Sequence, residues 1–175
     1  MKLTEPFFSQ MNLDENVMEG YEAHDVRHLK DLTGYYQDED ITEILENENP
    51  VVYEVYKREV PKESGELLHC VTVINPGRVG SEYYMTKGHF HQDETCAEIY
   101  YGQKGHGRLV MQKGSESRSI EIFPGTIAYI PAGWGHRTVN VSDAEPFVFF
   151  SIWPGHSGYD YERVAQEPFA KVESE

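Results

Sequence analysis

The sequence predicts an all-β fold, a single antiparallel sandwich or barrel with one or two short helices. Residues 51–155 consist of short segments rich in β-branched and aromatic residues. Gly, Pro, Asn and Asp separate these segments at intervals of about 8–12 residues, the spacing typical of such folds. With 175 residues, of which 39% are hydrophobic, the chain is long enough for one domain with its own core.

Residues 1–50 are expected to form an arm that packs on the barrel or on a partner subunit and ends in a short helix. Short apolar groups alternate there with acidic and turn residues. Over 40–48 (DITEILENE), apolar residues recur at helical spacing. Asp40 is the predicted N-cap, with Glu43 three residues later, and Pro50 prevents the helix from continuing.

The barrel is assigned to residues 51–155 and the C-terminal tail to 156–175. The tail contains one expected short helix, broken near Pro168. No linker, repeat or low-complexity block interrupts the chain, so one domain is predicted overall. The expected strands are, in chain order, VVYEVYKREV, ELLHCVTVI, EYYMTK, CAEIYYG, HGRLVMQK, SRSIEIF, TIAYI, HRTVNV and PFVFFSIW.

The composition excludes several classes of partner. The formal net charge is −15, so nucleic acid and anionic membranes would be repelled. No segment approaches the roughly 18 consecutive apolar residues of a membrane span. The N-terminus lacks a basic stretch followed by an apolar run, which predicts a cytoplasmic protein. Cys70 and Cys96 lie in strand-like segments and are expected to be buried, reduced thiols.

A first candidate metal motif lies in GHFHQDETCAEIYY, which starts at Gly88. Side chains at i and i+2 of a strand face the same side, so His89 and His91 can point together into a barrel. Glu98 lies in the next strand-like segment, and Tyr100 shares its face. On its own the His-x-His pair is equally typical of solvated strand histidines, so this motif needs a second one.

The second motif is GTIAYIPAGWGHRTVN, residues 125–140, which fits the pattern G-x5-P-x-G-x2-H-x3-N. In the first segment, Glu98 is followed after six residues by Gly105. Together these two segments resemble the two motifs of the cupin superfamily. The resemblance implies a small jelly-roll barrel that holds one metal ion through His89, His91, Glu98 and His136.

The first segment departs from the general cupin pattern in two ways. Position 83 is Tyr where the motif begins with Gly, and Glu98 follows His91 by seven positions instead of four or five. This long spacing, with the run TKGHFH, is similar to the cupin-type glucose-6-phosphate isomerases of archaea and some bacteria. The segments PVVYEVY, INPGRVG, AEIYYG and EPFVFFSIWP also resemble that family.

That resemblance implies a homodimeric enzyme that interconverts glucose 6-phosphate and fructose 6-phosphate. Glu98 is the candidate base, acting through a cis-enediolate, with Tyr100 as its catalytic partner and a metal-assisted hydride shift as the rival route. The ligand set suits a divalent first-row transition metal. Fe²⁺ is the first choice, and Mn²⁺, Ni²⁺ and Zn²⁺ stay open.

The resemblance also assigns substrate contacts. Three positions match those that hold phosphate in the family, two match sugar-contacting tyrosines, and Lys87 adds a positive charge. Trp153 and Tyr159 stand where the family commonly has Tyr and His, which leaves the ring-opening residue open, with His156 as a candidate. The predicted substrate-binding residues are Tyr53, Thr72, Thr86, Lys87, Gly88, Trp153, His156 and Tyr161.

Two other functions compete with this interpretation. Other cupins use three histidines and a glutamate for dioxygenation, and such a pocket is expected to be largely apolar. Others bind sugars or metals without catalysis and have often lost a ligand. All four ligand positions are occupied here, and Thr, Lys and Tyr are expected in the pocket, so both alternatives are less favoured.

Overall fold

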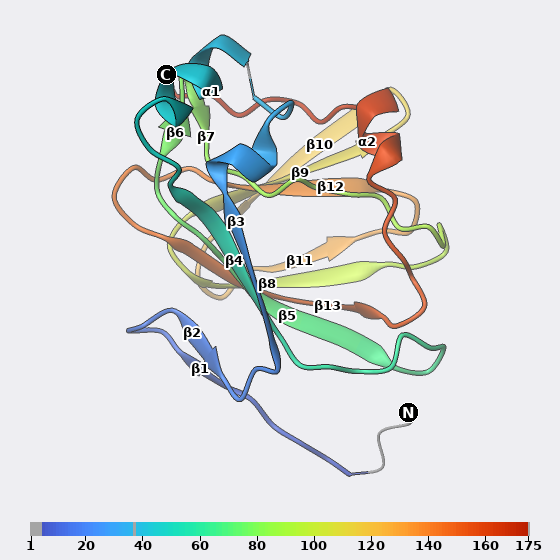
Figure 1. The fold of residues 1–175 in the computed structure, drawn as a ribbon. Coiled ribbons are helices and arrows are strands. Elements are labelled where there is room, and N and C mark those ends of the chain that lie inside the picture. The colour runs from blue at the N-terminus through green and yellow to red at the C-terminus, as the bar shows by residue number, and fades with distance from the viewer. Residues whose placement is uncertain (1–4, 37, 175) are drawn as a thin grey trace.

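Strands make up most of the regular secondary structure of the described residues, and they form two facing sheets (Figure 1). The computed structural model describes residues 5–36 and 38–174. The larger sheet has the strand order β11-β8-β13-β5-β4-β3 and the smaller one the order β10-β9-β12, with antiparallel pairing throughout. Two short ribbons, β1-β2 and β6-β7, complete the strands. The bounds of the strands in both sheets and both ribbons are β1 Gln10–Asn12, β2 Val17–Glu19, β3 Ala23–His28, β4 Val51–Lys57, β5 Leu67–Ile74, β6 Arg78–Val79, β7 Glu82–Tyr83, β8 Glu98–Lys104, β9 Gly107–Lys113, β10 Glu116–Ile122, β11 Ile127–Ile130, β12 Gly135–Asn140 and β13 Phe147–Pro154.

The helices are short, as the sequence predicts. They are the 3-10 helix Leu29–Leu32 and the α-helices α1 (Asp38–Leu45) and α2 (Glu162–Gln166). Because α1 begins at Asp38, Asp40 lies inside the helix, and its predicted role as N-cap is wrong. No helix within the described ranges is long and apolar enough to cross a membrane. The predicted all-β fold with short helices is confirmed.

The larger sheet begins earlier in the chain than residue 51. Strand β3 pairs with β4, with Asp25 opposite Val55 and Arg27 opposite Tyr53. The pattern AHDVRH alternates side chains between the two faces of the sheet, so Asp25 and Arg27 point the same way. The segment expected to be an arm therefore supplies an edge strand of the main sheet, while β1 and β2 form a separate ribbon.

The space between the sheets has an apolar half and a polar half. Phe147 stacks on Phe149 with ring centroids 5.3 Å apart, and Phe149 stacks on Tyr100 at 4.7 Å. Tyr100 in turn lies against His136 of the opposite sheet, with the ring centroids 5.7 Å apart. This aromatic row separates the packed core from a cavity lined by polar side chains.

The C-terminal segment covers the outer face of the smaller sheet beside β12 (Figure 1). All six residues of β12 are buried, although alternate side chains of a strand point to opposite faces. The Phe169 ring stacks near Phe90, with 6.0 Å between centroids, and the Arg137 guanidinium lies 5.0 Å from the Phe169 ring. Burial on both faces holds β12 in place and with it the His136 side chain.

Candidate active site

Four side chains from two sequence segments form one buried cluster between the sheets. Their nitrogen and oxygen ligand atoms all lie within 4.8 Å of one another. The cluster, here called the His–Glu cluster, consists of the four residues that the sequence analysis assigns to the metal, His89, His91, Glu98 and His136.

Backbone hydrogen bonds join the two segments at this cluster. His89 forms an isolated antiparallel bridge with His136. The His89 and His91 rings lie on the same side, with centroids 5.5 Å apart, although the segment is extended chain outside the regular strands. Phe90 between them is buried in the apolar core, as the alternation predicts.

Two histidines are oriented through their Nδ1 atoms. His91 Nδ1 lies 3.1 Å from the carbonyl oxygen of Cys96, and His136 Nδ1 lies 3.4 Å from that of Trp134. Because a carbonyl oxygen can only accept a hydrogen bond, each Nδ1 carries the ring proton. In the neutral ring, Nε2 then has a free lone pair that points away from this carbonyl. Both Nε2 atoms face the same carboxylate oxygen, Glu98 Oε2, at 3.1 Å. Lone pairs that converge in this way need protons or a cation between them.

Burial and nearby charges together set the pKa values of Glu98 and His89 in the cluster. Burial alone would raise the pKa of Glu98, but the charge and close contact of His136 and the hydrogen bond with His91 outweigh it and lower the pKa to about 2. Burial, followed by the charge of His136, lowers the pKa of His89 well below its usual value. Glu98 is therefore a carboxylate and His89 a neutral imidazole near pH 7.

The cluster fits a transition-metal ion. The buried Nε2 atoms of His89 and His136 have no hydrogen-bond partner within the described residues. His136 Nε2 lies 3.1 Å from Glu98 Oε2, but the angles of this contact are not those of a hydrogen bond. Two ligand atoms about 2.1 Å from one ion at a right angle lie about 3.0 Å apart, close to the distances between Glu98 Oε2 and the two histidines. Three imidazoles and one carboxylate are typical ligands of divalent first-row metals.

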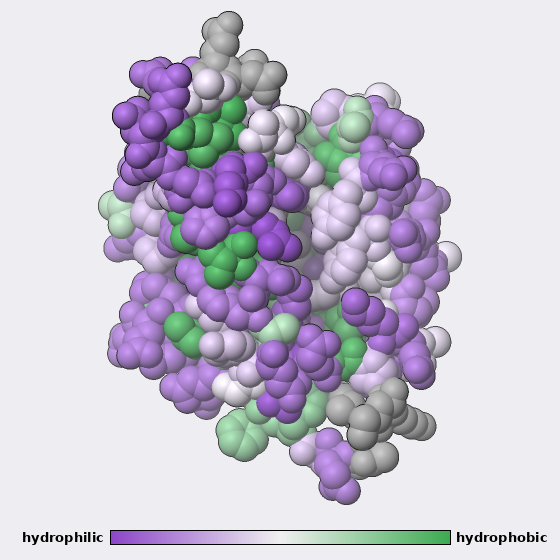
Figure 2. Space-filling view, in the orientation of Figure 1, coloured by the Kyte–Doolittle hydropathy of each residue, from purple (hydrophilic) through white to green (hydrophobic). Residues whose placement is uncertain are grey.

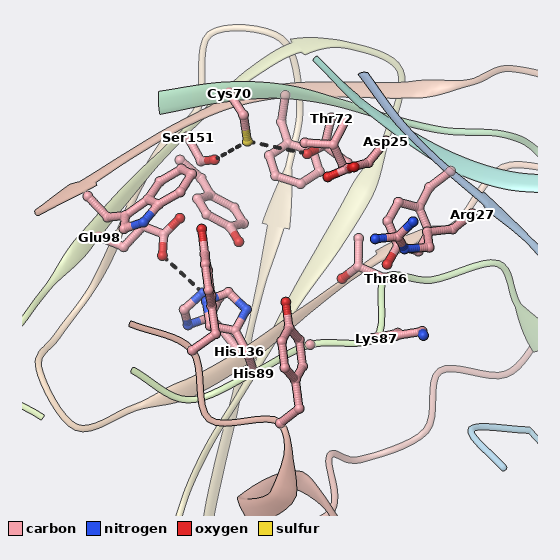
Figure 3. A pocket seen from close by; sticks show the side chains of 18 of the residues that line it. Asp25, Arg27, Cys70, Thr72, Thr86, Lys87, His89, Glu98, His136 and Ser151 are labelled. Atoms are coloured by element: carbon pink, nitrogen blue, oxygen red, sulfur yellow. Dashed lines mark hydrogen bonds and ion pairs between the residues drawn. The ribbon is translucent and has the colours of Figure 1, made fainter. Parts of the chain in front are cut away.

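Three members of the cluster, His89, Glu98 and His136, line one end of a pocket with a volume of about 400 Å³, within the usual range for small ligands. Figure 2 shows a mostly hydrophilic face with a hollow near its middle, between the β3 side and the α2 side of the molecule. Figure 3 shows His89, Glu98 and His136 of the His–Glu cluster on one side of the pocket and Arg27, Thr86 and Lys87 on the other. Of the predicted substrate-binding residues, the pocket brings together Tyr53, Thr72, Thr86, Lys87, Gly88, Trp153 and Tyr161.

His156 does not line this pocket. Its Nε2 lies 3.5 Å from Cys96 Sγ and 3.5 Å from Asp93 Oδ2, in the loops outside it. Tyr159, which stands at the altered family position, lines the pocket instead, and its ring centroid lies 4.9 Å from that of His89. The structure therefore separates His156 from the other predicted substrate contacts.

The side of the pocket away from the cluster is basic. Three cations, Arg27, Lys57 and Lys87, line the pocket, and Lys57 is ion-paired with Asp25. Arg27 and Lys87 have no carboxylate partner within the described part of the chain. Thr86 Oγ1 accepts a hydrogen bond of 3.1 Å from Thr138 N and keeps its own proton for a ligand. This side offers positive charge and donors to an anion.

Tyrosine hydroxyls supply the neutral donors of the pocket. Burial, and then the Glu98 charge, raises the pKa of Tyr100 well above its usual value. Burial raises the pKa of Tyr53 to about 12. Both side chains therefore keep their protons near pH 7 and can donate hydrogen bonds to substrate oxygens.

Some lining residues were not predicted from the sequence. Strand alternation could have found most of them, because they lie two or four positions from predicted residues on the same strand face. Others lie on β3, where the sequence predicts an arm. The unpredicted lining residues are Asp25, Arg27, Tyr35, Val55, Lys57, Cys70, Phe149, Ser151 and Tyr159.

Two facing antiparallel sheets that enclose three histidines and a glutamate define a cupin-type protein whose buried side chains fit a divalent transition metal. A family profile described as glucose-6-phosphate isomerase matches residues 26–171. The chain therefore belongs to the glucose-6-phosphate isomerase family, in its cupin-type branch.

Relatives of that name cover nearly the whole chain. The glucose-6-phosphate isomerase of Thermococcus litoralis is 41% identical over 98% of this chain and 90% of its own length. That of Pyrococcus horikoshii is 43% identical over 96% and 89%, and that of Sinorhizobium medicae 38% identical over 94% and 78%. A solved oxalate decarboxylase of Bacillus subtilis matches 74% of this chain and 31% of its own, with 22% identity and a TM-score of 0.48.

Proposed function

We propose that the protein is a metal-dependent glucose-6-phosphate isomerase that interconverts glucose 6-phosphate and fructose 6-phosphate. One observation carries the proposal: a single pocket is lined by His89, Glu98 and His136 of the His–Glu cluster at one end and by unpaired Arg27 and Lys87 at the other. This polarity matches an open-chain hexose phosphate, with its carbonyl end and its phosphate at opposite ends. Family membership over nearly the full chain supports the same activity.

The proposed proton transfer uses the two oxygens of Glu98 differently. Both histidine contacts involve Oε2, so we assign the role of base to Oε1. Oε1 takes the proton from C2 of the open-chain aldose, which gives the cis-enediolate with its negative charge on O1. Transfer of the O2 proton to O1 moves the charge to O2, and return of the proton from Oε1 to C1 then forms the C2 carbonyl of the ketose. Tyr100, beside Glu98 on β8, donates its hydroxyl to an oxygen of the reacting carbons.

His89, His91, His136 and Glu98 are the proposed ligands of the metal ion. A divalent ion bound there would polarise the carbonyl oxygen and stabilise negative charge on the reacting oxygens. We propose Fe²⁺ as the native ion, since imidazole and carboxylate ligands suit it; Mn²⁺, Ni²⁺ and Zn²⁺ are the alternatives.

The phosphate is assigned to the basic side of the pocket. Arg27 and Lys87 offer charge, and the Thr86 hydroxyl and the Gly88 backbone offer neutral contacts. Thr72 and Tyr53 line the wall between this side and the His–Glu cluster, where the sugar hydroxyls are expected. Trp153 and Tyr161 complete the proposed contacts. A dioxygenase pocket would be more apolar than this one.

The decisive experiment is metal removal and restoration. The purified protein is treated with a chelator, single metals are restored, and conversion of fructose 6-phosphate is assayed. Activity is expected only after metal is restored. If no metal-restored form isomerises fructose 6-phosphate, the proposed function is wrong. Glu98→Gln sharpens the test, because retained metal with lost activity supports the base role, while retained activity contradicts it.

We also propose a homodimer that forms through the outer face of β8 and β11. Four large apolar side chains are exposed there and pair across the two strands: Ile127 opposite Tyr101 and Tyr129 opposite Ile99. Exposed apolar patches of this kind mark interaction sites, and β11 is an edge strand. A monomer in sedimentation at micromolar concentration would exclude the dimer, and Ile127→Lys is expected to dissociate it.

The substrate class also implies a location. Hexose phosphates are made and consumed inside the cell, so the proposed activity places the enzyme in the cytoplasm. Fractionation of cells that express the protein, with the isomerase assay as readout, tests this placement.

A further inference from the structure

Two loops outside the pocket bring a carboxylate, a thiol and an imidazole together. Asp93 and Cys96 lie in the loop before β8, and His156 lies in the loop after β13. Their ligand atoms all lie within 4.8 Å of one another, and none of the three lines the pocket. This group, the Asp–Cys–His cluster, has no role in the isomerase chemistry derived above.

The distances in this cluster fit a single small cation. His156 Nε2 lies 3.5 Å from both Cys96 Sγ and Asp93 Oδ2. In a tetrahedral zinc site, with about 2.3 Å to sulfur and about 2.0–2.1 Å to nitrogen or oxygen, ligand atoms lie roughly 3.3–3.6 Å apart. Two of the three ligand distances therefore already match such a site, and the third, between Cys96 Sγ and Asp93 Oδ2, is at most 4.8 Å.

Backbone and side-chain hydrogen bonds hold the three residues in place. Asp93 N donates to Ser157 O at 2.9 Å, which joins the two loops, and Cys96 N donates to Asp93 O at 3.0 Å. Asp93 Oδ1 accepts two bonds from Thr95, at 2.9 and 2.6 Å, so Oδ2 is the oxygen left for a ligand. The cluster is thus assembled before any ion binds.

We propose that Asp93, Cys96 and His156 form a second metal site, which takes Zn²⁺ or a cation of similar softness. The thiolate distinguishes this site from the His–Glu cluster, which offers nitrogen and oxygen only, because sulfur ligands favour zinc over harder cations. Cys96 is buried, while Asp93 and His156 are partly exposed, so the ion can enter from solvent and keep a water as its fourth ligand. Binding releases the thiol proton.

The second site supports the first one through two connections. The Cys96 carbonyl accepts the hydrogen bond from His91 Nδ1 at 3.1 Å, so an ion on Cys96 restrains the group that orients His91. The loop that carries His156 continues to Tyr159 and Tyr161, which line the pocket. Zinc at this site thereby fixes a metal ligand and a pocket wall without contacting substrate.

Cobalt is the probe that separates the two sites, because Co²⁺ bound to a thiolate shows a ligand-to-metal charge-transfer band in the near ultraviolet. The metal-free protein is titrated with Co²⁺, in parallel with the variants Cys96→Ser and Cys70→Ser. The band is expected in the wild type and in Cys70→Ser and is expected to be lost in Cys96→Ser. Its persistence in Cys96→Ser, or its absence from the wild type, overturns the proposal.

Zinc stoichiometry gives a second, independent readout. Equilibrium dialysis is expected to give two Zn²⁺ per chain for the wild type and one for His156→Gln, whose side chain is partly exposed and therefore least disruptive. One equivalent in both proteins overturns the second site. Both measurements are made without substrate, so they stand whether or not the chain isomerises fructose 6-phosphate.

Discussion

His89 and His136 bind each other through their backbones as well as facing each other through their rings. His89 N donates to His136 O at 3.1 Å, and His136 N donates to His89 O at 3.0 Å. The ring centroids lie 4.5 Å apart. Two metal ligands from separate motifs are therefore placed by a reciprocal pair of main-chain bonds, and the ligand geometry depends on the backbone at this bridge.

Gly88→Ala is predicted to disrupt that bridge. Gly88 has a φ of +73°, and a Cβ there would lie 2.8 Å from His136 O and 2.7 Å from a Phe169 ring carbon. Adding the methyl group displaces the carbonyl that bonds to His89. We expect a loss of about 2–4 kcal/mol in the free energy of unfolding and weaker metal binding, measured by urea denaturation and by metal titration.

Gly65→Ala is the matched control. Gly65 has a φ of +93°, but nothing lies within 4 Å of the added Cβ. This variant is expected to lose only the roughly 1–2 kcal/mol that a left-handed conformation costs, with metal affinity unchanged. Equal losses in the two variants would show that conformation alone, and not the contact with His136, matters at Gly88.

Solvent hydrogen is predicted to enter the sugar during turnover. If Glu98 carries the proton between C2 and C1, reaction in deuterated water places deuterium on these carbons, detected by NMR of the product. Glu98 is buried, so the incorporation is expected to be partial. A product without deuterium in repeated turnovers would favour the hydride shift and remove Glu98 Oε1 from its role as base.

Alternation along strands explains how much of the site the sequence could predict. Glu98 and Tyr100 were placed correctly on one face because the segment CAEIYY is regular and its polar residues are unusual for a buried strand. Applied to β4, the same rule would also have predicted Val55 and Lys57 as site residues, because they share a strand face with Tyr53 and line the pocket.

Long-range pairing explains what the sequence could not predict. The segment AHDVRH is too polar for its strand character to stand out, and only its pairing with β4 brings Arg27 to the pocket. His156 lies close in sequence to pocket residues, yet the loop after β13 turns it toward Asp93 and Cys96. Neither outcome follows from local spacing, because both depend on partners more than 25 residues away.

Arg27→Met is predicted to weaken substrate binding without slowing chemistry. Arg27 has no carboxylate partner among the described residues and lies on the basic side, so its loss removes a charged contact to phosphate. A charged hydrogen bond contributes about 1.5–3 kcal/mol, so KM for fructose 6-phosphate is expected to rise roughly 10- to 100-fold with kcat nearly unchanged. Arg118→Met, an exposed change on β10, is the control and should leave KM as it is. An unchanged KM in Arg27→Met would place the phosphate elsewhere.

Asp25→Asn is predicted to change stability and substrate binding in opposite directions. A hydrogen bond from Lys57 is the main cause that lowers the pKa of Asp25. The stabilisation is therefore fully present above the unfolded pKa of Asp, near 3.9, and is lost as pH falls through the lower folded value. Both side chains are about a third exposed, so solvent screening limits the effect to about 0.5 kcal/mol at pH 7.

The two consequences are measured separately. Urea denaturation at neutral pH should show the small loss in Asp25→Asn, and the difference from the wild type should shrink at a pH below that of the unfolded carboxyl. Removal of a negative charge from the pocket frees Lys57 and should lower KM for the anionic sugar phosphate. A raised KM would mean instead that Asp25 contacts the sugar directly, because only loss of a favourable contact outweighs the gain in positive charge.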